Sequence, residues 1–196
     1  FLLKFNQMKL LFKNAHIIDA QSPYHLQTVD VLVDGDTIES IGEIAAPEGA
    51  IVIDLNGDTL TTGFAELHSD LGELGNEESE TLQTGAAAAA AGGFTAVGVV
   101  SNGGPYLDEK TGIEFLLSKG ESVPVNIVPI GTMSKGRKGE ELSEMFEMNN
   151  YGTNVFGDYK QGVTNANLLK LALLYTKPFG TIMVHPEDRN LSVNGM

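Results

Sequence analysis

The pattern of hydrophobic and polar positions changes once along this chain, near residue 61. Before that point, apolar residues occur in short runs or alternate with polar ones, and Asp-Gly or Asn-Gly pairs separate the runs. This pattern is typical of short β-strands joined by tight turns. We expect strands at residues 10–18, 30–33, 37–41, 50–54 and 59–60. Residues 8–60 are therefore predicted to form a small antiparallel β-sandwich domain.

After Gly63, segments with the period of a strand alternate with segments with the period of a helix. Strands are expected at residues 63–70, 94–100, 125–130, 153–156 and 181–185, and helices at residues 81–91, 110–119, 140–148 and 165–176. Such alternation predicts an α/β domain with a parallel sheet, covering residues 61–196. The alanines of residues 86–91 predict a helix that packs closely on the sheet.

The number of strands leaves two architectures open. A closed (β/α)8 barrel typically needs about 250 residues, and about 134 follow the first domain. The second domain is either an open sheet of five strands or the front part of a barrel. Half a barrel would expose two sheet edges, which proteins usually avoid.

Composition and charge narrow the class of protein. The chain has no cysteine, which excludes disulfides and thiolate chemistry and fits a cytoplasmic location. Its net charge of −14 argues against binding to nucleic acid, and no segment is apolar enough to predict a membrane span. We expect Met8 to be the natural start, with residues 1–7 upstream of it.

Polar residues with metal-binding chemistry stand where predicted strands end. His68 and Asp70 end the first strand of the second domain, Asp158 follows the fourth, and His185 ends the fifth. Chemistry in α/β barrels takes place at these carboxyl ends. Each residue also has an ordinary interpretation, because strand-end histidines are commonly hydrogen-bonded core residues and such aspartates commonly cap turns. His16 and His25 lie in no motif.

Several motifs occur in order and resemble one family. The first strand of that family ends in Pro-Gly-Phe-x-Asp-x-His-x-His-Leu-Arg-Glu-Pro-Gly, and an alanine-rich helix and Gly-Gly-Phe-Thr follow. The matching segments here are TGFAELHSDLGELG (62–75), ET (80–81), TG (84–85), GGFT (92–95), GTMSKG (131–136) and HPED (185–188). The runs KNAHIID (13–19) and DVLVDGDTIESIG (30–42) fit the family's first domain. The chain therefore resembles the dihydroorotases, of the cyclic amidohydrolase group.

The resemblance implies the first part of a (β/α)8 barrel, with about five strands present, and a zinc-dependent site. It implies His68, Asp70, Asp158 and His185 as metal ligands and Asn102 as a substrate contact. The ordinary interpretation of Asn102 is that it holds a turn. The metal would activate water for attack on a ring carbonyl. It also places the catalytic aspartate beyond Met196.

Two positions depart from the family pattern. Asp70 stands where the second histidine is expected, and Gly72 stands where an arginine would bind the substrate carboxylate. Asp can ligate zinc, whereas glycine cannot replace the arginine. The glycines and apolar positions of the family pattern are kept, while the metal-binding and substrate-binding positions are changed. We therefore expect an impaired or repurposed site.

Three functions follow from the resemblance. The first is a non-catalytic subunit of pyrimidine biosynthesis, in a homo-oligomer or assembled with aspartate carbamoyltransferase. The second is an active zinc-dependent dihydroorotase that interconverts carbamoyl aspartate and dihydroorotate. The third is a related cyclic amidase that acts on a different ring. The changes at Asp70 and Gly72 favour the first.

Overall fold

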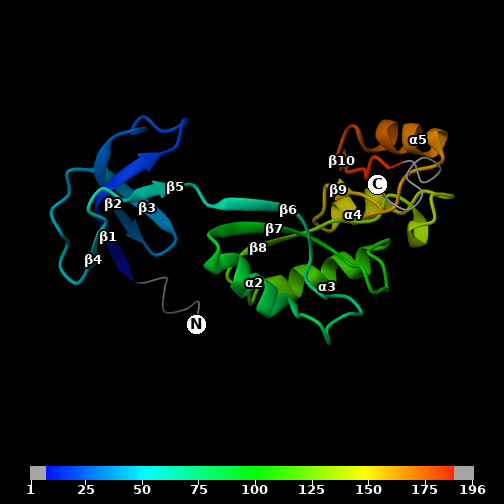
Figure 1. Cartoon of the computed structure of the whole chain (residues 1–196), viewed down its shortest axis with the longest axis horizontal. Coiled ribbons are helices and arrows are strands. Elements are labelled where there is room, and N and C mark those ends of the chain that lie inside the picture. The colour runs from blue at the N-terminus through cyan, green and yellow to red at the C-terminus, as the bar shows by residue number, and fades with distance from the viewer. Residues whose placement is uncertain (1–7, 188–196) are drawn as a thin grey trace, which may run out of the picture. The chain divides into compact units, whose positions relative to one another are not determined.

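The computed structural model describes residues 8–187 and divides into two compact units, one ending at Thr62 and the other beginning at Gly63 (Figure 1). The first unit contains β1 (Lys9–Ile18), β2 (Thr28–Asp34), β3 (Thr37–Gly42), β4 (Ile51–Asp54) and β5 (Thr59–Thr61). The second contains β6 (Phe64–Asp70), α2 (Leu82–Ala91), β7 (Phe94–Val100), α3 (Lys110–Gly120), β8 (Asn126–Pro129), η1 (Lys135–Arg137), α4 (Met145–Asn150), β9 (Val155–Phe156), α5 (Ala166–Thr176) and β10 (Thr181–Ile182).

The described strands of the first unit form one mixed sheet in the order β3-β2-β1-β4, with β5 also paired to β1. β1 is antiparallel to β2 but parallel to β4 and β5. The expectation of a wholly antiparallel unit is therefore wrong. Its physical cause is that β2 occupies one edge of β1, so the chain crosses over before β4 and then runs along the other edge in the direction of β1. The two-sheet sandwich stays a prediction.

The second unit is α/β, and each of its strands lies beside the next one in the sequence. β6, β7 and β8 form a parallel sheet in that order, and β9 pairs in parallel with β10. A parallel bridge between Gly131 and Phe156 connects the segment after β8 to β9. The carboxyl ends of β6 to β9 therefore point to the same side of the unit, where the loops that follow them can meet.

Three of the four predicted helices lie close to their expected positions, because their ends carry recognisable signals. Thr81 caps α2 and forms a capping box with Thr84, and Asn165 caps α5 by accepting a hydrogen bond from the Leu168 N–H. The helix expected at residues 140–148 begins only at Met145. Residues before it pair back instead, through a bridge between Ser134 and Leu142.

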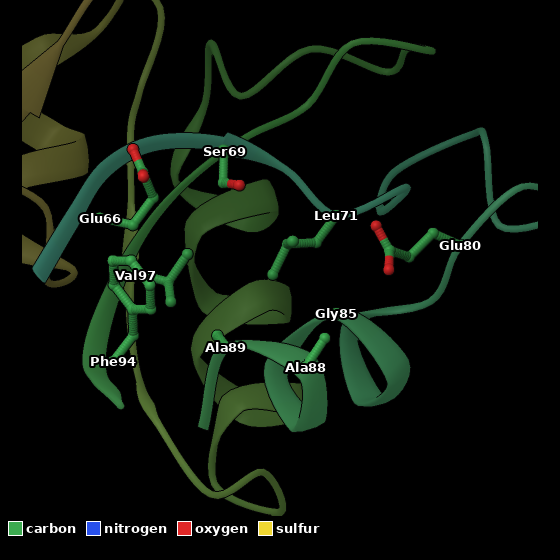
Figure 2. A pocket seen from close by; sticks show the side chains of 9 residues that line it. All are labelled: Glu66, Ser69, Leu71, Glu80, Gly85, Ala88, Ala89, Phe94 and Val97. Atoms are coloured by element: carbon green, nitrogen blue, oxygen red, sulfur yellow. The ribbon is translucent and has the colours of Figure 1, made fainter. Parts of the chain in front are cut away.

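The alanine-rich helix α2 packs against the core of the second unit. Ala86 is fully buried, a Cβ added to Gly85 would come within 2.7 Å of Leu71, and Ala89 and Ala90 pack against the buried core. The small side chains also leave a cavity of about 260 Å³ beside the helix, whose lining includes Ala88, Ala89 and Glu66 (Figure 2). The helix therefore packs closely on the core but leaves this cavity unfilled.

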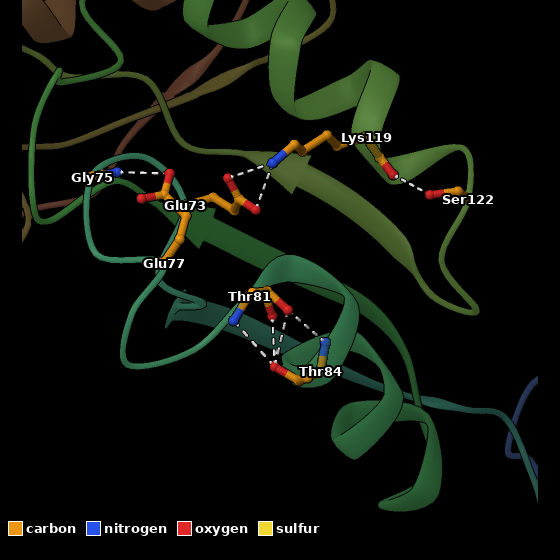
Figure 3. A network of polar contacts seen from close by, with 7 residues as sticks. All are labelled: Glu73, Gly75, Glu77, Thr81, Thr84, Lys119 and Ser122. Carbon is orange, nitrogen blue, oxygen red and sulfur yellow. Dashed lines mark hydrogen bonds and ion pairs between the residues drawn. The ribbon is translucent and has the colours of Figure 1, made fainter.

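The loop after β6 is fixed from inside by a charged pair. Glu73 is 1% exposed, and both of its oxygens accept hydrogen bonds at 2.8 Å from Lys119 near the end of α3 (Figure 3). A buried carboxylate is tolerated when a cation and hydrogen bonds compensate for its lost hydration. This pair ties the loop that carries Gly72 to a neighbouring helix. Within residues 8–187, no helix is long and apolar enough to cross a membrane.

Candidate functional site

The candidate site lies at the carboxyl ends of the strands in the second unit. β6 supplies His68 and Asp70, the segment after β7 begins with Ser101, and Asp158 follows β9. The loop between β8 and α4, residues 130–144, adds a residue that the sequence did not indicate, Arg137.

Asp158 is buried and bonds to the start of the loop 130–144. One carboxylate oxygen accepts from the N–H groups of Met133 and Ser134, both at 2.9 Å, and the other accepts from the Ser134 hydroxyl at 2.5 Å. These three hydrogen bonds compensate for the hydration that the buried carboxylate loses, without a metal. Asp158 therefore already has a structural role in fixing the loop.

Asp70 and Gly72 together form a turn that leaves no room for a side chain at position 72. The Asp70 carboxylate accepts a hydrogen bond at 3.0 Å from the Gly72 N–H. Gly72 has a φ of +77°, and a Cβ added there would lie 2.0 Å from the Glu80 carbonyl oxygen. Only glycine fits this backbone path. The position at which the family pattern carries an arginine is thus closed by the main chain itself.

His68 is partly buried and stacks on a tyrosine. Its ring lies 5.1 Å from the ring of Tyr159 with an interplanar angle of 17°, and the backbone N–H of His68 donates to the Glu66 carboxylate at 3.0 Å. Burial lowers the pKa of His68 below its usual value, and the positive charges of Lys160 and Arg137 act in the same direction. A neutral imidazole is the form that can bind a metal, through a nitrogen in the ring plane that stacking on Tyr159 does not cover.

Arg137 holds its guanidinium between two aromatic rings. Its terminal nitrogen donates to the Ser101 carbonyl, and the guanidinium carbon lies 4.6 Å from the Tyr106 ring centre and 5.4 Å from that of Tyr159. Burial lowers the pKa of Arg137, whereas Tyr106, Asp158, Tyr159 and Asp70 raise it. The sequence offers one signal that could have indicated this residue: it is one of two arginines in an acidic chain, and it lies in a glycine-rich loop after a strand.

The other predicted site residues, His185 and Asn102, form none of the contacts described above for this cluster. His185 pairs with Glu187 at 3.4 Å and forms a bridge with Gly162, and Asn102 is exposed. Among residues 8–187, no group of three or more His, Asp or Glu side chains is arranged to hold a metal ion. Asp188 and the catalytic aspartate expected beyond Met196 lie outside the described residues.

Solved structures with the same architecture are cyclic amidohydrolases. A D-hydantoinase covers 96% of this chain with a TM-score of 0.69 and 22% identity, and the chain covers 41% of it. The dihydropyrimidinase of Brevibacillus agri covers 92% with a TM-score of 0.68 and 24% identity, and 40% of it is covered. At these identities the likeness defines the fold alone, which this chain shares with those enzymes.

The sequence comparisons define the family within that class. The model of the Dihydro-orotase-like family matches residues 57–192. Curated dihydroorotases of Pelotomaculum thermopropionicum and Ruminiclostridium cellulolyticum are each 37% identical, over 190 and 191 residues. The chain belongs to the dihydroorotase-like family. Both alignments cover 96% of this chain and 44% of the relative, so the chain spans somewhat under half the length of these curated relatives.

Proposed function

We propose that this protein is a dihydroorotase-like member of pyrimidine biosynthesis in which the ancestral cyclic amide hydrolase site is impaired, so that it acts as a non-catalytic subunit. The observation that carries this proposal is the backbone at Gly72. A Cβ at this position would meet the Glu80 carbonyl oxygen at 2.0 Å, so this loop path has no room for the arginine of the family pattern. A bidentate carboxylate clamp from this position would require a different loop path.

The proposed architecture is the first part of a (β/α)8 barrel preceded by a β-sandwich. Its support is the order of β6 to β10, in which each strand runs parallel to the next, as in the barrel fold. Among residues 8–187, β6 pairs along one edge only, with β7, and Phe64 and Leu67 on this strand are exposed. Further strands of the whole protein would pair with this edge and with β10.

The proposed site does not fit a zinc centre as its residues are arranged. His68, Asp70, Asp158 and His185 have the right donor chemistry for zinc. However, Asp158 is bonded to the loop 130–144 and His185 pairs with Glu187, and no three or more such side chains of residues 8–187 are grouped to hold a metal ion. We therefore derive no step that depends on a metal. The role that remains for the retained scaffold is assembly, in a cytoplasmic homo-oligomer or with aspartate carbamoyltransferase.

An active zinc-dependent dihydroorotase is the second candidate. Its support is the 37% identity to curated dihydroorotases over nearly all of this chain. In that case His68, Asp70, Asp158 and His185 would have to rearrange into a ligand set, Asn102 would contact the substrate, and zinc would supply activated water. A related amidase for another ring is a third candidate, with the fold of the hydantoinases as its support.

Turnover by the full-length protein decides between these proposals. Dihydroorotate hydrolysis and its reverse would be followed with added Zn²⁺, beside an active dihydroorotase as positive control. We expect no turnover above the uncatalysed rate. Zinc-dependent turnover that is lost in His68→Ala and retained in His25→Ala, whose histidine lies in the first unit, would overturn the non-catalytic proposal.

A further inference from the structure

Arg137 is a fixed cation at the carboxyl end of the sheet. Its guanidinium bonds to the carbonyl of Ser101, which is fully buried, and the rings of Tyr106 and Tyr159 lie near it. It forms no ion pair with any carboxylate of residues 8–187, and its buried Nε has no hydrogen-bond partner within the same part of the chain. An arginine stays charged in such surroundings, so this charge is a permanent feature of the site.

The guanidinium acts on the same residues that the family resemblance implies as metal ligands. Burial lowers the pKa of Arg137, and the charges of Asp158 and Asp70 act to raise it. The backbone N–H of Arg137 donates at 3.1 Å to the carbonyl of Ser134, the residue whose hydroxyl donates to Asp158. The Tyr159 ring connects Arg137 to His68, because it contacts both the guanidinium and the imidazole. Two carboxylates and one imidazole thus share their surroundings with a positive charge that belongs to the protein.

The loop is held on both sides of Arg137, which keeps the guanidinium in place. Before it, Asp158 binds Met133 and Ser134, and the Gly136 N–H donates to Asp108 at 3.0 Å. After it, the Gly139 N–H donates to the Ser134 hydroxyl at 2.9 Å. Arg137 itself has a φ of +56°, a left-handed conformation that is unfavourable for a residue with a side chain. Strain of this kind persists only where surrounding contacts fix the backbone.

We propose that Arg137 is the resident cation of this site: its guanidinium supplies the positive charge around which His68, Asp70 and Asp158 are arranged, and it lowers the affinity of the site for divalent cations. A divalent ion among these donors would be repelled by the guanidinium through a medium that screens charge less than water does. The proposal deepens the proposed function and rests on it, because it gives a physical reason why the impaired site would bind divalent cations weakly.

Titration calorimetry of the full-length protein with Zn²⁺ tests this proposal. Arg137→Met removes the charge and keeps a similar apolar length, Arg137→Lys keeps the charge, and Lys138→Met removes an equal charge from the exposed neighbour. We expect Arg137→Met to bind Zn²⁺ at least about tenfold more tightly than the wild type, a change of about 1.4 kcal/mol. Arg137→Lys and Lys138→Met are expected to stay within about threefold of the wild type. Adding Asp158→Asn to Arg137→Met should remove the gain.

Two results would overturn the proposal. The first is an Arg137→Met variant that folds, as its circular dichroism reports, and binds Zn²⁺ no more tightly than the wild type. The second is a wild type that already binds one Zn²⁺ with submicromolar affinity and loses it on Asp158→Asn. If Arg137→Met does not fold, Arg137→Gln, a neutral side chain that keeps amide donors for Ser101, replaces it with the same expectation. Unchanged Zn²⁺ affinity in these variants leaves the non-catalytic proposal standing, whereas turnover by the wild type contradicts that proposal whatever the variants bind.

Discussion

At the scale of single residues, the carboxylates of the site accept hydrogen bonds from backbone N–H groups of the same chain. Asp70 accepts from the Gly72 N–H and Asp158 from Met133 and Ser134. Each of these bonds fixes a loop at the carboxyl end of a strand. The same residues therefore hold the loops in place, and a ligand would have to compete with bonds that already exist.

Gly72→Ala should destabilise the protein strongly. The new Cβ would lie 2.0 Å from the Glu80 carbonyl oxygen, and the backbone is left-handed at φ +77°. Gly139→Ala is the matched control, because Gly139 has φ +69° and nothing within 4 Å of an added Cβ. We expect Gly139→Ala to cost about 1 kcal/mol and Gly72→Ala about 1–3 kcal/mol more, measured by urea unfolding. Equal costs would contradict the closed backbone path at position 72.

Asp30 makes the first unit sensitive to acid. Burial acts to raise the pKa of Asp30, but hydrogen bonds from the N–H groups of Asn14 and Ile44 and from Lys13 outweigh it, so its pKa lies below the ordinary value. The folded state therefore binds its proton at a lower pH than the unfolded state does, for which the pKa is about 3.9. The stabilisation is present above that pH and is lost as the pH falls towards the folded-state pKa.

Asp30→Asn should accordingly lower the free energy of unfolding at pH 7 by about 1–2 kcal/mol. The difference between variant and wild type should shrink as the pH falls below about 4. Asp36→Asn, at an exposed position after β2, is the control and should leave stability nearly unchanged. Unfolding in urea at several pH values measures this, and a difference that stays constant with pH would contradict it.

At the scale of elements, the strands and helices with clear end signals were predicted to within a residue or two. Thr81 and Asn165 mark the starts of α2 and α5, and the alternation of apolar residues marks β6 and β7. The helix expected from Glu140 was wrong over its first five residues. Acidic residues there resemble a helix start, but the segment bonds back to Met133 and Lys135. Such contacts between loop residues have no local signal in the sequence.

Thr81→Ala should weaken α2 by about 1 kcal/mol. The Thr81 hydroxyl accepts from the Thr84 N–H, and the Thr81 N–H donates to the Thr84 hydroxyl (Figure 3). Gln83→Ala, an exposed change in the same turn, should alter stability by less than about 0.5 kcal/mol. Thermal or urea unfolding compares the two, and an unchanged Thr81→Ala variant would show that the cap does not stabilise the helix.

At the scale of the whole molecule, the sequence order of the parallel strands and the Dihydro-orotase-like match agree on the ancestry of residues 57–192. The resemblance could be read from the sequence because the motifs that carry it are local: glycines, strand ends and the capped helix. The surroundings of Arg137 could not be predicted from the sequence. They consist of Tyr106, Ser101 and Tyr159, which the fold brings together from different loops. The central claim is that the scaffold is kept while the charge and backbone of its site have changed.

A zinc-edge anomalous difference map tests that claim most directly, from crystals of the full-length protein grown with excess Zn²⁺. We predict no peak among His68, Asp70, Asp158 and His185, with the Arg137 guanidinium between Tyr106 and Tyr159. A strong peak bound by Asp158 and either histidine, with Arg137 turned away, would contradict the account.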